Sequence, residues 1–83
     1  MDFVKILNEF DTTKISLDDK ALEILRVFPG PVIVSSTGLS RSVVYRLKED
    51  HSQEAMDKTS LQTIRKIVDF YDAINAVAHQ KWS

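Results

Sequence analysis

The stretch TGLSRSVVYRLKED, residues 37–50, places a glycine, a leucine and a serine directly before a segment with helical periodicity. At about 100° per residue, Val43, Val44 and Leu47 fall on one side of this helix and most of the polar residues fall on the other. Gly38 suits a turn that needs a positive φ, and Ser40 suits the N-cap position. The stretch therefore predicts a helix that begins abruptly after a tight turn, with Leu39 directed inward.

Three other segments have the apolar spacing of amphipathic helices, namely residues 2–10, 17–28 and 59–79. A possible capping pattern opens the second and third of these segments. The polar residues 50–58 are expected to connect the central helix to the last one. Together with the central helix, these segments predict an all-α protein.

Residues 31–37 are ambiguous, because Val32, Ile33 and Val34 form a β-branched run that would also suit a strand. Pro31 favours the first turn of a helix, and Gly30 can cap that helix. We therefore expect a fifth short helix here. The predicted fold is a compact all-α bundle of about five short helices.

The composition limits the chain to few classes of protein. Its 83 residues suit one globular domain, 1–83, and leave no room for a second. With no cysteine, and with His51 and His79 isolated, we expect no metal and no cofactor. No glycine-rich phosphate loop or catalytic array is visible, so we expect no enzyme. No export signal and no apolar run of about 18 residues is present, which favours the cytoplasm over a membrane.

The charges are distributed unevenly. The formal net charge is -1, yet residues 24–48 contain no acidic residue and four basic ones, Arg26, Arg41, Arg46 and Lys48. An acid-free basic window in an acidic chain indicates a local patch for an anionic partner. A chance run gives the same pattern.

The turn and its helix carry a resemblance. GLSRSVVYRLKE, with Ile33 five residues before Gly38 and with Val44 and Leu47 six and nine residues after it, resembles the Cro/repressor-type (XRE-like) helix-turn-helix family of phage and bacterial transcriptional regulators. TSLQTIRKIVDFYDAI, residues 59–74, looks like the helix that follows the motif in that family. The resemblance implies a helix-turn-helix domain whose reading unit, about residues 31–49, binds double-stranded DNA in the major groove.

Two positions depart from the family's pattern. Gly30 stands where the family usually has a glutamine that touches the DNA backbone, and Val34 stands where a small alanine lets the helices approach. The string GLSRSVVYRL also resembles the reading helix of IclR-type winged-helix regulators. Those regulators need a β-hairpin wing, whereas residues 50–83 have helical periodicity.

The resemblance and the side-chain chemistry together assign two kinds of DNA contact. The residues expected to contact bases are Arg41, Ser42, Tyr45 and Arg46. The guanidinium groups suit the O6 and N7 acceptors of guanine, and the tyrosine suits a thymine methyl group or a phosphate. The residues expected to contact the DNA backbone are Ser40, Lys48, Lys58, Thr59 and Ser60. Solvated helix faces and simple capping explain the same residues without DNA.

The last predicted helix has two apolar stripes where one core needs only one. The stripe expected to remain uncovered, and therefore to form a homodimer interface together with residues 2–10, contains Phe70, Ile74 and Val77. A monomer results if residues 2–10 cover this stripe within one chain. The sequence thus predicts a repressor-like regulator that binds operator DNA as a dimer. The alternative is a helix-turn-helix protein-interaction module that binds another regulator or, as an antitoxin, a toxin, and that binds little or no DNA.

Overall fold

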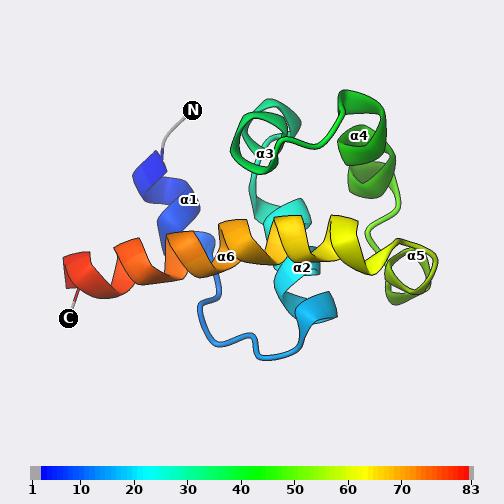
Figure 1. The fold of residues 1–83 in the computed structure, drawn as a ribbon. Helices are drawn as coiled ribbons and strands as arrows, with labels where there is room; N and C mark the ends of the chain where they lie inside the picture. The colour runs from blue at the N-terminus through cyan, green and yellow to red at the C-terminus, as the bar shows by residue number, and fades with distance from the viewer. Residues whose placement is uncertain (1–2, 83) are drawn as a thin grey trace.

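The computed structural model describes the backbone of residues 3–82 and the side chains of residues 4–77. Residues 3–82 form six helices: α1 (Phe3–Glu9), α2 (Leu17–Val27), α3 (Gly30–Thr37), α4 (Arg41–Glu49), α5 (Gln53–Asp57) and α6 (Leu61–Trp82). No strand occurs in this range, so the predicted all-α fold is confirmed (Figure 1). The β-branched run of residues 32–34 lies within α3, where Ile33 is fully buried.

The polar connection, residues 50–58, contains a helix that the sequence pattern does not predict. Helix α5 has five residues and begins after Ser52, whose Oγ accepts a hydrogen bond from the Ala55 N–H group at 3.2 Å. Met56 is its one buried residue. A helix this short shows too little periodicity to be recognised in the sequence.

Serine residues cap most of the other helices. The Oγ atoms of Ser16, Ser40 and Ser60 accept hydrogen bonds from the backbone N–H groups three residues later, at 3.1, 3.3 and 3.2 Å respectively. The expected cap at Gly30 is wrong, because Pro29 is the N-cap residue and Gly30 is the first residue of α3. A proline near a helix start removes only an N–H group that has no partner within the helix.

Helix α6 lies across the molecule and packs most extensively against α2 (Figure 1). Both helices and α3 and α4 contribute to one core, whose largest fully buried side chains include Phe28, Ile33, Val44, Ile67 and Tyr71. Toward the C-terminal half of α6, the Phe28 and Phe70 rings have centroids 5.0 Å apart. No helix in the described part of the chain, including the 22-residue α6, has the length and apolarity needed to cross a membrane.

The stripe expected to form a dimer interface is partly covered within the chain. Ile74 is only 8% exposed and belongs to the core, so its assignment to an interface is wrong. Phe70 is half-buried against Phe28. Val77, 47% exposed, is the one member of the stripe that remains accessible. Periodicity indicates which residues share a face, but it does not indicate which neighbouring segment covers that face.

The turn between α3 and α4 has the expected conformation. Gly38 has φ 76° and ψ 6°, and its N–H group donates to the Val34 carbonyl at 3.0 Å. Leu39 is partly buried against the core, as predicted. This left-handed glycine ends α3 and lets α4 begin three residues later.

Gly38→Val should lower the free energy of unfolding by at least about 1–2 kcal/mol, because L residues are strained in the left-handed region. A Cβ at this position meets no atom within 4 Å, so the loss is conformational and not steric. Gly38→Asn is the matched control, because asparagine tolerates positive φ better. Urea denaturation measures both variants. A valine variant as stable as the parent would contradict the left-handed turn.

Candidate nucleic-acid interface

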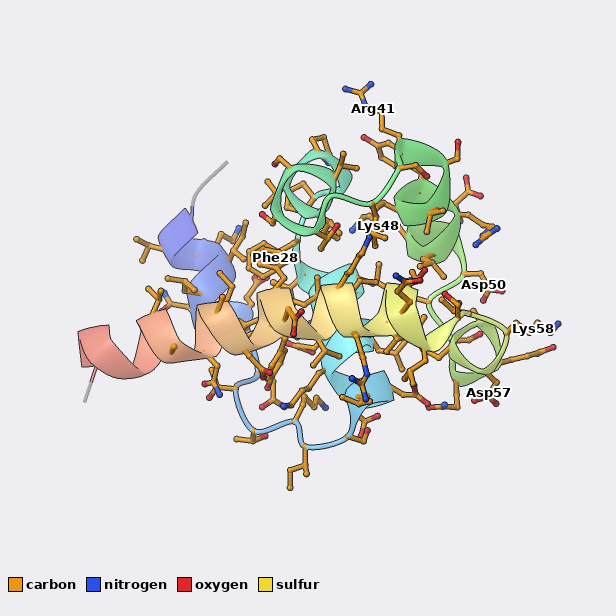
Figure 2. All side chains as sticks on the ribbon, in the orientation of Figure 1. Phe28, Arg41, Lys48, Asp50, Asp57 and Lys58 are labelled. Carbon is orange, nitrogen blue, oxygen red and sulfur yellow. The ribbon has the colours of Figure 1, made fainter. Side chains whose placement is uncertain are left out.

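Helix α4 has one buried side and one exposed side. Val44 is fully buried and Leu47 is 2% exposed. The four residues predicted to contact bases, Arg41, Ser42, Tyr45 and Arg46, are all exposed. Figure 2 shows Arg41 extending away from the body of the molecule at the start of α4. The structure therefore brings the predicted base-contact residues together on one accessible surface, which we call the α4 face.

Lys48 lies on α4 but is not available for the DNA backbone. Its Nζ donates hydrogen bonds to the Leu25 carbonyl at 2.9 Å and to the Phe28 carbonyl at 2.6 Å. In Figure 2 its side chain points inward, away from the direction of Arg41. Burial lowers the pKa of the Lys48 ammonium group. The predicted contact between Lys48 and a phosphate is therefore wrong, because this cation belongs to the interior of the fold.

Pro29 explains why the end of α2 needs Lys48. A helical carbonyl accepts from the N–H group four residues later, and the residue four positions after Leu25 is Pro29, which has no N–H group. The Leu25 carbonyl would have no donor without Lys48. Cations near helix C-termini also interact favourably with the helix dipole. Lys48 thus satisfies the end of α2 and attaches α4 to it.

Arg26 is also used within the fold. It donates two hydrogen bonds to Glu23, Nε to Oε1 at 3.0 Å and Nη2 to Oε2 at 2.6 Å, and Nη2 also reaches the Glu9 carbonyl at 3.1 Å. Glu23 is only 4% exposed, and its hydrogen bonds raise the pKa of Arg26. Two of the four cations in the acid-free window therefore hold helices together. Arg41 and Arg46 are the two that remain on the α4 face.

The second predicted backbone-contact site, residues 58–60, lies next to the C-terminal end of α4. A surface pocket of about 290 Å³ lies between the C-terminal half of α4 and the end of α5, and its lining includes Arg46, Asp50, Lys58 and Thr59. Lys58 is highly exposed and pairs with Glu54 at 3.2 Å. Exposed pairs of this kind contribute little stability, so Lys58 remains available to a partner. Sequence spacing alone did not reveal that Arg46 and Lys58 line one cavity.

The hydroxyl groups of this second site already have partners. Thr59 Oγ1 donates to the Ala55 carbonyl at 2.7 Å. Ser60 Oγ accepts from the Thr63 N–H group and donates to Thr63 Oγ1 at 2.9 Å. Both residues therefore have a capping role, and Lys58 is the group of this site with charge to offer an anion.

Gly30, in the first turn of α3, lies next to Tyr45 of the α4 face. A Cβ on residue 30 would overlap Tyr45 Cε1 and would lie 2.9 Å from Cζ and 3.0 Å from Cδ1. The tyrosine ring thus occupies the space that a side chain at position 30 would need. A residue larger than glycine at position 30 would therefore displace the ring.

Comparisons with protein-family models, with curated proteins and with solved structures found no match to this chain.

Lys48→Met should lower the free energy of unfolding by about 2 kcal/mol, because it removes charged hydrogen bonds and leaves buried carbonyls without donors. Lys58→Met is the matched control and should change stability by less than about 0.5 kcal/mol. Chemical denaturation of the three proteins measures the difference. Equal losses in the two variants would show that Lys48 does not hold α2 and α4 together.

Proposed function

We propose that the protein is a sequence-specific DNA-binding transcriptional regulator, repressor-like and of phage or mobile-element type, that acts in the cytoplasm. One observation carries the proposal: α4 starts sharply after a left-handed glycine and presents two arginines, a serine and a tyrosine on one exposed face. A reading helix needs this arrangement, because its N-terminal residues must reach base edges in the major groove.

The proposed mechanism is occupancy of an operator. Arg41 and Arg46 donate to the O6 and N7 atoms of guanine, and Ser42 reaches the bases or phosphates beside the start of α4. Ser40 and Lys58 lie at the two ends of this surface and contact the DNA backbone. Lys48 has no part in this contact, because its ammonium group is bound to α2.

A protein-interaction module is the second candidate, and the charge distribution favours it. Because Lys48 is bonded inside the fold and Arg26 is paired with Glu23, few exposed cations near α4 remain unpaired with the rest of the fold, and the formal net charge is -1. Salt dependence separates the two functions. DNA binding releases counterions and weakens steeply as salt rises. Pairing with a protein through apolar contacts responds little.

Arg41→Ala should weaken specific DNA binding by about 1–3 kcal/mol and relax the preference at one base pair, because a bidentate contact is lost. Binding sites are first selected from random-sequence DNA, and affinity is then measured as a function of salt. Lys66→Ala is the charge-matched control, because Lys66 is an exposed residue of α6 that belongs neither to the α4 face nor to the residues assigned to an interface. If no DNA sequence is enriched, or if both variants bind like the parent, the proposed function is wrong.

We further propose that the regulator binds its operator as a homodimer. We place the interface on α1 and the C-terminal part of α6, where two apolar residues are exposed. Val77 on α6 is 47% exposed, and Val4 on α1 is 53% exposed. A two-fold pair has to place its reading helices about one DNA turn apart, roughly 34 Å, to match a palindromic site.

Val77→Glu should convert the dimer to a monomer and weaken operator binding, because it places a charge in an apolar interface. The substituted residue is exposed in one chain, so the fold should remain stable. Sedimentation at micromolar concentration measures the mass, with Gln62→Glu at the other end of α6 as the control for added charge. A monomeric parent protein, or a dimeric Val77→Glu variant, would rule out this interface.

A further inference from the structure

Gly30 positions Tyr45 because it has no side chain, so the ring can occupy the space that a Cβ at position 30 would fill. The backbone conformation of Gly30 is not the reason. Among the described residues, Gly38 alone has a positive φ, so Gly30 has a conformation open to any residue. A Cβ at position 30 would nevertheless meet three ring atoms of Tyr45, which form the side of the ring from Cδ1 to the hydroxyl-bearing Cζ. A glycine at position 30 therefore allows the ring to lie directly on the first turn of α3.

This contact restricts the ring before any partner binds. Tyr45 remains 42% exposed while the Cδ1–Cζ side of the ring rests on α3. A side chain that is already ordered loses less conformational entropy on binding. Tyr45 thus offers a fixed apolar surface on the α4 face, one turn beyond Arg41 and Ser42.

We propose that Tyr45, held by Gly30, reads the 5-methyl group of a thymine in the major groove and so determines specificity at one base pair of each half-site. This inference rests on the proposed function. Thymine is the base that presents a methyl group in the major groove, and apolar side chains recognise it by contact. The arginines of the same face recognise guanine by hydrogen bonds, so the tyrosine supplies a different kind of selectivity.

Deoxyuridine substitution tests the inference, because uracil lacks the 5-methyl group and keeps the base-pairing groups of thymine. Each thymine of the selected site is replaced in turn, and the affinity of each duplex is measured. At one thymine per half-site, the parent protein should bind about fourfold more weakly, which corresponds to one buried methyl group. With Tyr45→Ala, the same replacement should have no effect.

Three further variants separate a methyl contact from other roles of Tyr45. Tyr45→Phe keeps the ring and should keep the sensitivity to uracil. Gly30→Ala should lose it, because the added Cβ would overlap the ring and displace it from its position on α3. Ser42→Ala alters a neighbouring residue of the same face and should leave the sensitivity unchanged. Thermal denaturation confirms that each variant is folded.

The outcomes distinguish the two proposals. If no DNA is enriched, the proposed function fails and this inference fails with it. If a site is enriched but the parent protein binds thymine and uracil duplexes equally, this inference alone is wrong. Loss of the sensitivity in Tyr45→Phe would also overturn it, because the hydroxyl group and not the ring would then be responsible.

Discussion

The orientation of α4 depends on how the chain satisfies the end of α2. Pro29 removes the N–H group that the Leu25 carbonyl would normally accept from, and Lys48 provides the missing donor from α4. The same ammonium group bonds to the Phe28 carbonyl, so one side chain joins the end of α2 to the last turn of α4. With the inward side of α4 fixed in this way, its opposite side faces solvent.

The position of a basic residue on α4 therefore decides whether its charged group bonds within the fold or remains available to a partner. Lys48 and Arg46 are two residues apart on α4, yet one bonds to backbone carbonyls inside the fold and the other lines an exposed cavity. A count of basic residues in the central window overstates the charge that DNA would meet. Recognition by this protein would depend on a few well-placed groups, Arg41, Arg46 and the ordered ring of Tyr45.

The sequence was sufficient for features that depend on local chemistry. Apolar periodicity and serine caps predicted the long helices, and the glycine before Leu39 predicted the left-handed turn. It was insufficient where the partner is distant along the chain. Lys48 bonds to carbonyls 20 and 23 residues away, and Ile74 is covered by segments that periodicity does not identify. The contact between Gly30 and Tyr45 is of the same kind, since only the packing of α3 on α4 brings them together.

The central claim is that the α4 face enters the major groove of DNA, and chemical protection tests it most directly. Dimethyl sulfate methylates guanine at N7, in the major groove, and adenine at N3, in the minor groove. On a selected site, the account predicts that the bound protein protects guanine N7 atoms in each half-site and leaves adenine N3 atoms reactive. Protection confined to adenine N3, or no protection at a saturated site, would contradict the placement of α4 in the major groove.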